Sequence, residues 1–175
     1  GLGNPRIAVN VSAKQFKQKG LVDLINNTLK ETGLDPDFLE LEITESCILE
    51  NANIAIDMMH EIKKMGIHLS VDDFGVGYSS LNMLKQLPID KLKIDRSFVK
   101  GVTTNAHDAT IVKSIISLAH NLNLKVIAEG VETREQLEFI RSHDCDGIQG
   151  YLVDKPELPG KYKNLVVSEH DDIIS

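Results

Sequence analysis

The chain has 175 residues, of which 42% are hydrophobic and 26% are charged, and its formal net charge is −7. This composition is typical of a globular domain, and the acidic balance argues against DNA or RNA as the main partner, because phosphate neutralisation needs clustered Lys and Arg. No apolar run approaches the ~18 residues that span a bilayer, and the first residues do not resemble a signal peptide. Cys47 and Cys145 have no metal-ligand spacing and do not suggest a disulfide framework. We therefore expect a cytoplasmic location, although upstream domains could anchor a longer parent chain in a membrane.

Apolar segments of two kinds alternate along the chain. Short apolar runs predict strands at residues 7–11, 39–43, 68–71, 91–95, 125–128 and 147–149. Apolar residues spaced three or four apart predict helices at 20–32, 51–65, about 79–84 and around 111–122. Thr133, followed three residues later by Gln136, is a capping-box pattern that predicts the start of another helix. This alternation predicts an α/β fold, with a mostly parallel sheet and helices outside it.

Polar residues gather where each predicted strand ends. A parallel barrel takes its catalytic groups from the carboxyl ends of several strands, whereas an open doubly wound sheet concentrates its ligand at one switch point. Contributions from all the predicted strands therefore favour a barrel. A (β/α)8 TIM-like barrel needs about 250 residues, so we expect this chain to hold about six of its eight units, with the missing units at the N-terminus. The strand-end residues are Asn10, Glu42, Asp72, Asp73, Lys93, Asp95, Glu129, Glu132 and Gln149.

The segment 68–80, HLSVDDFGVGYSS, contains the strongest local pattern. An apolar run ends in two adjacent carboxylates, Asp72 and Asp73, and a glycine-rich turn follows. Adjacent side chains on a strand point to opposite faces, so both acids can serve one site only where the strand is ending. Such an acid pair beside a mobile loop suits a hard divalent cation and a phosphate held under the loop. The alternative is a polar turn in which the Asp side chains bond their own backbone.

Each of the other strand-end residues also has a purely structural alternative. Asn10 could satisfy backbone groups, Lys93 could be an exposed strand lysine, and Gln149 could stabilise a turn. Glu42 shares a strand face with Glu40, so one of the two could be a solvated or salt-bridged acid. These residues become informative only as a group.

Together the strand ends bring several acids, an amide and an ammonium to one end of the predicted sheet. Converging carboxylates repel one another unless a cation is present, because buried charges must be paired or coordinated. Oxygen ligands without His or Cys indicate Mg²⁺ or Mn²⁺ rather than Zn²⁺. The acids are Glu42, Asp72, Asp73 and Glu129, the last of which could instead support the helix cap near Thr133.

Six segments resemble, in order, the successive motifs of the EAL domain, a family of bacterial cyclic di-GMP phosphodiesterases. They are VNVS (9–12), LELEITES (39–46), VDDFGVGYSSL (71–81), KLKIDRSFV (91–99), IAEGVET (127–133) and GIQGYLVDKP (147–156). The resemblance implies a modified (β/α)8 barrel, in agreement with the count of strands. We expect residues 1–160 to be the C-terminal portion of an EAL domain and 161–175 to be a C-terminal tail.

The resemblance also implies a site with two divalent cations, Mg²⁺ or Mn²⁺. Asn10, Glu42 and Asp72 would bind one cation, and Asp73 and Glu129, sharing Asp72, would bind the second. The Glu-Ala-Leu tripeptide that names the family is absent from this chain. In the family its Glu is a ligand of the first metal. The chain therefore resembles an N-terminally truncated EAL domain.

Further roles follow from the same resemblance. Lys93 would hold or deprotonate the attacking water, Gln149 would order the water or the phosphate, and Glu129 would belong to the catalytic set as well as to the metal site. The loop that begins at Asp73 would act as a gate. Its gating residues would be Phe74, Gly75, Gly77 and Tyr78, its anchors Glu45 and Asp95, and the rim of the site would be supported by Glu132.

We expect the parent protein to hydrolyse cyclic di-GMP to linear pGpG, and this chain alone to be inactive. The implied partners are cyclic di-GMP, a second copy of the domain and an upstream GGDEF or sensor module. One alternative is a non-catalytic cyclic di-GMP-binding or dimerisation module. Another is an unrelated Mg²⁺-dependent barrel enzyme of the aldolase or enolase type, with Lys93 as base or Schiff-base nucleophile.

Overall fold

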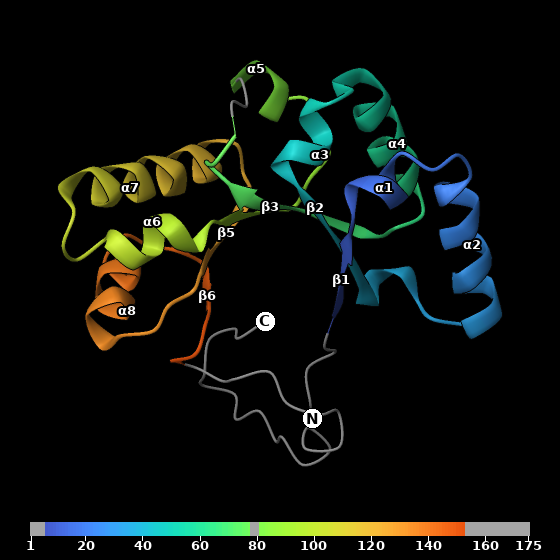
Figure 1. The fold of residues 1–175 in the computed structure, drawn as a ribbon. Helices are drawn as coiled ribbons and strands as arrows, with labels where there is room; N and C mark the ends of the chain where they lie inside the picture. Colours follow the sequence, from blue (N-terminus) through green and yellow to red (C-terminus); the bar gives the residue numbers. More distant parts are fainter. Residues whose placement is uncertain (1–5, 78–80, 153–175) are drawn as a thin grey trace, which may run out of the picture. The chain divides into compact units, whose positions relative to one another are not determined.

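A computed structural model describes residues 6–77 and 81–152 (Figure 1). Two compact units divide the chain: an N-terminal unit, Arg6–Lys93, and a C-terminal unit that begins at Ile94. Each unit is an alternation of strands and helices. None of the helices within the described ranges combines the length and the apolar character needed to cross a membrane.

The N-terminal unit is built on strands that follow one another in chain order. These are β1 (Ile7–Val11), β2 (Leu39–Thr44), β3 (His68–Phe74) and β4 (Lys91–Ile94), the last of which crosses the boundary between units at its final residue. The pairs β1–β2 and β2–β3 are parallel. The connecting helices are α1 (Ala13–Phe16), α2 (Leu21–Thr32), a 3-10 turn (Pro36–Phe38), α3 (Glu45–Leu49), α4 (Ala52–Lys64) and α5 (Leu81–Leu84).

The two faces of these strands differ in chemistry, because side chains alternate with a period of two. One face is apolar, with Ile43, Leu69 and Leu92 fully buried, and it packs beneath α3 and α4, whose Ile48 and Met59 are also fully buried. Figure 1 shows α3 and α4 on this side of β2 and β3. The opposite face, called here the inner face, carries buried polar side chains. They are Glu40, Glu42, Ser70 and Lys93.

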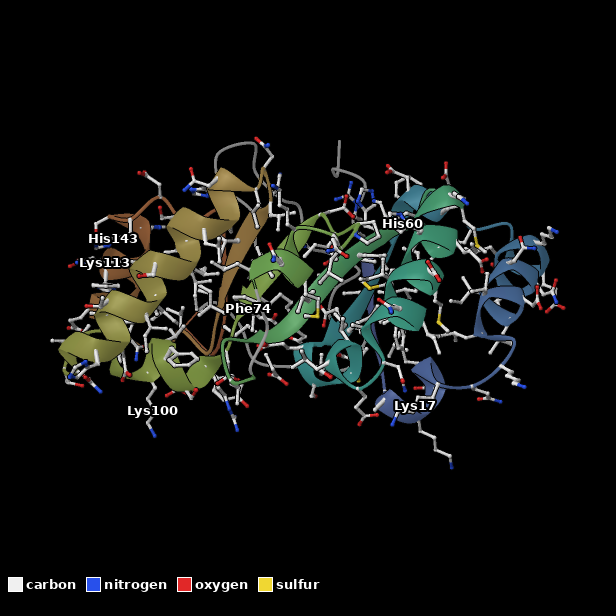
Figure 2. All side chains as sticks on the ribbon, turned by 90° about the horizontal axis from the view of Figure 1, so that it is seen from above. Lys17, His60, Phe74, Lys100, Lys113 and His143 are labelled. Carbon is white, nitrogen blue, oxygen red and sulfur yellow. The ribbon has the colours of Figure 1, made fainter. Side chains whose placement is uncertain are left out.

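The C-terminal unit contains α6 (Arg96–Gly101), α7 (Ala106–Asn121), β5 (Lys125–Glu129), α8 (Arg134–Arg141) and β6 (Gly147–Gln149). Strands β5 and β6 are parallel. Thr133 and Gln136 form the predicted capping box at the start of α8. Between α7 and α8, the ammonium of Lys113 lies 5.4 Å from the centre of the Phe139 ring, and the rings of Phe139 and His143 are tilted by 32° with their centres 4.5 Å apart. Figure 2 labels Lys113 and His143 in this part of the molecule.

The predicted alternation is confirmed, and each predicted strand and long helix is present within a few residues of its expected bounds. Strand β3 continues through Asp72 and Asp73 to Phe74, whereas we expected it to end at residue 71. The short helices α1, α3 and α6 were not predicted, because four to six residues are too few to establish a helical period. The expected helix start at residue 79 and the tail 161–175 lie outside the described residues.

Candidate active site

The register of the N-terminal strands places several predicted site residues in neighbouring rows on the inner face. Asn10 of β1 is opposite Glu42 of β2, and Glu42 is opposite Ser70 of β3. One row further along, Thr44 is opposite Asp72. Because paired residues of parallel strands project to the same face, Asn10, Glu42 and Asp72 share this surface near the carboxyl ends of the strands.

Lys93 is buried on the inner face and lies between two of these acids. Its Nζ is 2.9 Å from Glu42 Oε1 and 3.4 Å from Asp72 Oδ1, and the residue is only 3% exposed. The alternative that Lys93 is a solvent-exposed strand lysine is therefore wrong. Low exposure makes both contacts stronger than a surface ion pair, since water screens them poorly. The ammonium is thus fixed beside the residues predicted to bind metal.

Asp73 departs from ordinary strand geometry. Its φ is +52°, in the left-handed region, which is unfavourable for most residues but is tolerated by Asp and Asn. Its backbone N–H donates a 3.0 Å hydrogen bond to Oδ1 of Asp72. This conformation breaks the alternation of side chains, so the two adjacent acids are not confined to opposite faces. Backbone strain of this kind is concentrated at functional sites.

The loop after β3 is held by one buried carboxylate. Glu45, the first residue of α3, is 3% exposed, and its Oε2 accepts 3.0 Å hydrogen bonds from the N–H groups of Gly75 and Gly77. A Cβ added at Gly77 would lie 2.8 Å from Glu45 Cδ, so a side chain at position 77 would displace the Glu45 carboxylate from this position. Phe74 is buried at the start of the loop, and the predicted gating residue Tyr78 lies outside the described residues.

The C-terminal unit positions the remaining candidates at the ends of its own strands. Glu129 ends β5 and is opposite Gln149 at the end of β6. The exposed Glu132 donates its backbone N–H to Gln136 Oε1 at 2.8 Å, next to the capping box of α8. Asp95 is the N-cap of α6, because its Oδ1 accepts a 2.8 Å hydrogen bond from the Ser97 N–H. The predicted roles of these four residues in a shared site stay predictions.

One feature of the inner face was missed from the sequence. Lys91 Nζ lies 2.8 Å from Glu40 Oε2, so a second Glu–Lys pair lies two residues before the pair Glu42–Lys93. The matching i, i+2 spacing of two Glu on one strand and two Lys on another was the available signal. Glu40 and Glu42 are therefore both salt-bridged acids.

The donor set of the N-terminal unit fits a hard divalent cation. Lys93 engages one oxygen of each carboxylate, so Glu42 and Asp72 each have a second oxygen with which to coordinate a cation, and Asn10 adds an amide oxygen. Oxygen ligands of this type suit Mg²⁺, Mn²⁺ or Ca²⁺.

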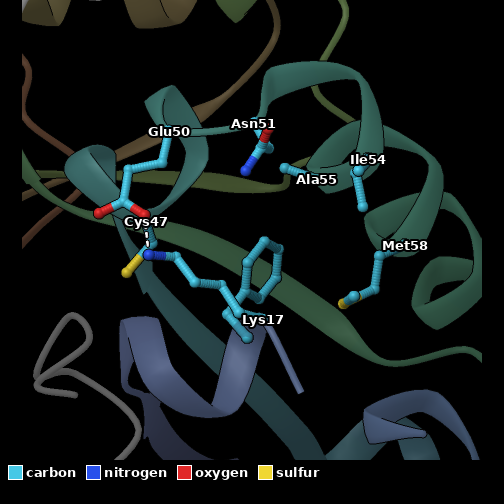
Figure 3. A pocket seen from close by; sticks show the side chains of 8 residues that line it. Lys17, Cys47, Glu50, Asn51, Ile54, Ala55 and Met58 are labelled. Atoms are coloured by element: carbon cyan, nitrogen blue, oxygen red, sulfur yellow. Dashed lines mark ion pairs between the residues drawn. The ribbon is translucent and has the colours of Figure 1, made fainter. Parts of the chain in front are cut away.

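A separate pocket of about 120 Å³ lies among the helices of the N-terminal unit (Figure 3). Phe16, Cys47 and Met58 line it, and the ion pair between Lys17 and Glu50 lies at its edge. It contains none of the predicted site residues.

The family model and the curated relatives that match this chain agree with one another. The sequence profile of the EAL domain matches residues 2–156. NbdA of Pseudomonas aeruginosa, a cyclic di-GMP phosphodiesterase, is 44% identical over 151 residues, which are 86% of this chain and 19% of that protein. MucR of the same organism, a bifunctional diguanylate cyclase and cyclic di-GMP phosphodiesterase, is 46% identical over 150 residues, 86% of this chain and 22% of that protein. The chain thus spans about a fifth of the length of these curated relatives.

Solved structures match over most of the chain. The PaMucR phosphodiesterase in complex with c-di-GMP has a TM-score of 0.87 and 44% identity, covering 89% of this chain and 63% of that one. BlrP1 of Klebsiella pneumoniae, in complex with calcium and cyclic di-GMP, has a TM-score of 0.78 and 30% identity, covering 86% of this chain and 39% of that one. These matches confirm the predicted α/β, TIM-barrel-like fold class.

Proposed function

Since this chain belongs to the EAL domain family, we propose that the protein of which it is part hydrolyses cyclic di-GMP to linear pGpG. The observation that carries the proposal is the buried ammonium of Lys93, held by Glu42 and Asp72 at the carboxyl ends of parallel strands. That end of the strands is where parallel α/β barrels hold their reacting groups. The names of NbdA and MucR support the choice of substrate.

The cofactor we propose is Mg²⁺ or Mn²⁺, with two ions in each complete site. Asn10, Glu42 and Asp72 would hold one ion, and Asp73 and Glu129 would hold the other together with Asp72. When bound, such ions lower the pKa of a coordinated water and neutralise charge on the scissile phosphate.

Lys93 orients the attacking water in this proposal. An ammonium that faces two carboxylates has no lone pair with which to accept a proton, so it acts as a hydrogen-bond donor rather than as a base. The same property argues against the Schiff-base alternative, which needs a neutral amine. Borohydride trapping with a carbonyl substrate tests that alternative directly.

The loop that starts at Phe74 is the proposed gate. Glu45 fixes it through Gly75 and Gly77, and a change at this carboxylate would release two backbone donors at once. We propose Asp95 as a second anchor, Glu132 as support at the rim and Gln149 as the residue that orders the water or the phosphate. The expected partners are a second copy of the domain and an upstream GGDEF or sensor module, in a cytoplasmic setting.

The test is release of pGpG from cyclic di-GMP by a protein that contains this chain within a complete domain, with Mg²⁺ or Mn²⁺ in excess. We expect turnover in the parent protein and its loss in Lys93→Met, with cyclic di-GMP still bound. Binding without turnover in the parent protein would instead support the alternative, a non-catalytic receptor.

A further inference from the structure

Two ion pairs with buried carboxylates cross the same strand on the inner face of the N-terminal unit. Strands β2 and β4 flank β3, and the pairs Glu40–Lys91 and Glu42–Lys93 join them at 2.8 and 2.9 Å. Ser70 of β3 is opposite Glu42, and His68, two residues earlier, is opposite Glu40. Ser70 is therefore a direct neighbour of one pair and a diagonal neighbour of the other.

Two polar atoms in this region lack partners. Glu40 Oε1 and Ser70 Oγ are buried, and neither has a hydrogen-bond partner within residues 6–77 and 81–152. The residues are 3% and 0% exposed. Leaving a buried polar atom unsatisfied is costly, and more so for an atom of a charged group. Buried polar groups without protein partners are normally bridged by internal water.

We propose that one internal water molecule binds between Glu40 Oε1 and Ser70 Oγ. The water donates to the carboxylate and accepts from the hydroxyl, so it satisfies both atoms. Its two partners project from the same face of adjacent strands, one diagonal step apart. A single water molecule can bridge two polar groups that do not bond each other directly.

The water also affects the position of the Lys93 ammonium. Only the predicted effect on turnover rests on the proposed function. Lys93 is two residues from Lys91 on the same face of β4, so it is the next ammonium along the face from Glu40. Without the water, Glu40 Oε1 would compete with Glu42 and Asp72 for that ammonium, since a buried anion seeks a donor. Ser70 is thus a positioning residue, because the water that it binds keeps the Lys93 ammonium beside Glu42 and Asp72.

A high-resolution crystal structure of the complete domain tests the water without reference to activity. The expected result is density within about 2.7–3.2 Å of both Glu40 Oε1 and Ser70 Oγ. In Ser70→Ala we expect the water to be lost and Lys93 Nζ to move away from Glu42 toward Glu40. The proposal is overturned by a direct hydrogen bond between Ser70 and Glu40, or by the absence of water density between these two side chains. An unmoved Lys93 in the variant overturns it as well. These results stand whether or not the protein hydrolyses cyclic di-GMP.

Turnover gives a second measurement. Ser70→Ala should lower kcat by roughly two- to tenfold and leave KM unchanged. This decrease corresponds to the loss of about one hydrogen bond. In a Glu40→Leu, Lys91→Leu background the competing carboxylate is gone, so Ser70→Ala should then have no effect on kcat. Ile43→Val, a cavity variant on the apolar face, controls for lost stability. An equal loss of kcat in both backgrounds, or in Ile43→Val, overturns the positioning role.

Discussion

Lys93 Nζ lies 2.9 Å from Glu42 Oε1, although the two residues come from β4 and β2, which are separated by β3. The pair therefore passes over the inner face of β3, where Ser70 is opposite Glu42. A small residue at position 70 leaves room for this crossing. Because both charges are buried, the pair is sensitive to the loss of either partner.

The first prediction is that Lys93→Met destabilises the protein in the absence of divalent cations. Glu42 and Asp72 lose their shared ammonium, and removing one member of a buried ion pair costs about 3–5 kcal/mol. Mg²⁺ or Mn²⁺ should restore much of this loss, because a ligand that binds only the folded state stabilises it by mass action. Urea unfolding with EDTA or with excess Mg²⁺ measures both effects.

Lys63→Met is the matched control for that experiment. Lys63 Nζ contacts both oxygens of Asp90 at 2.8 Å, but the two side chains are 28% and 37% exposed. We expect a loss of about 1 kcal/mol or less that does not depend on Mg²⁺. Equal losses in the two variants, or no response of Lys93→Met to the cation, would contradict the prediction.

The second prediction concerns the loop anchor. In Glu45→Gln the two hydrogen bonds from Gly75 and Gly77 lose their charge-assisted character, and each such bond is worth roughly 1.5–3 kcal/mol. Amide hydrogen exchange at Gly75 and Gly77 should become faster, with little change in the strands. Glu50→Gln, at a half-exposed ion pair with Lys17, is the control and should leave exchange in the loop unaltered. Unchanged protection in Glu45→Gln would show that other contacts hold the loop.

Much of this arrangement was predictable from the residues alone. The position of Glu42, Asp72 and Lys93 at the ends of apolar runs predicted that they share one end of the sheet, and the structure brings the three side chains into contact. Their role in a metal site stays a prediction. Partner choice was not predictable, since the contact between Lys93 and Glu42 depends on strand order and register across β3. The left-handed backbone conformation of Asp73 could not be predicted from the sequence either, because nothing in an Asp-Asp pair specifies a positive φ.

The third prediction separates the metal role of Asp73 from its backbone role. Asp73→Asn should abolish turnover, because a neutral amide is a weak ligand for a hard cation. The fold should be retained, since Asn tolerates a φ of +52° as well as Asp does. Asp144→Asn is the same change at another left-handed position, with φ of +59°, and should leave turnover unaltered. Normal hydrolysis by Asp73→Asn at saturating Mg²⁺ or Mn²⁺ would remove Asp73 from the metal site.

The fourth prediction is a loss of stability at alkaline pH that depends on Cys145. Burial raises the pKa of the Cys145 thiol from 9.0 to about 11. Between these values the unfolded chain releases the proton and the native chain retains it, so the free energy of unfolding falls as pH rises. A rise of about two pKa units corresponds to about 3 kcal/mol, at about 1.4 kcal/mol per unit. Because the Cys145 residue is partly exposed, solvent lowers this contribution to roughly 2 kcal/mol.

Chemical unfolding of the native chain and of Cys145→Ala at pH 8 and at pH 11 measures this contribution. Lysine and tyrosine titration affects both proteins alike, so the difference between them reports the thiol. We expect the variant to lose less stability over this interval. Identical pH dependence would mean that the thiol is as accessible to solvent in the native state as in the unfolded chain.

The last prediction concerns the 175-residue chain by itself. We expect it to hydrolyse cyclic di-GMP far more slowly than a protein that also includes the part of the domain carrying the Glu-Ala-Leu tripeptide. This chain spans 63% of the PaMucR phosphodiesterase structure, and Ile7 and Val9 of β1 are 55% and 43% exposed. Without the additional carboxylate the first cation would be held by Asn10, Glu42 and Asp72 alone. Losing one ligand weakens metal binding by about 1–3 kcal/mol, or roughly 5- to 150-fold. A displacement of the phosphate by about 1 Å lowers the rate by on the order of a further hundredfold.

The measurement is pGpG release by both proteins with Mn²⁺ and Mg²⁺ in excess. Comparable kcat/KM values would mean that Asn10, Glu42, Asp72, Asp73 and Glu129 suffice for the metal site.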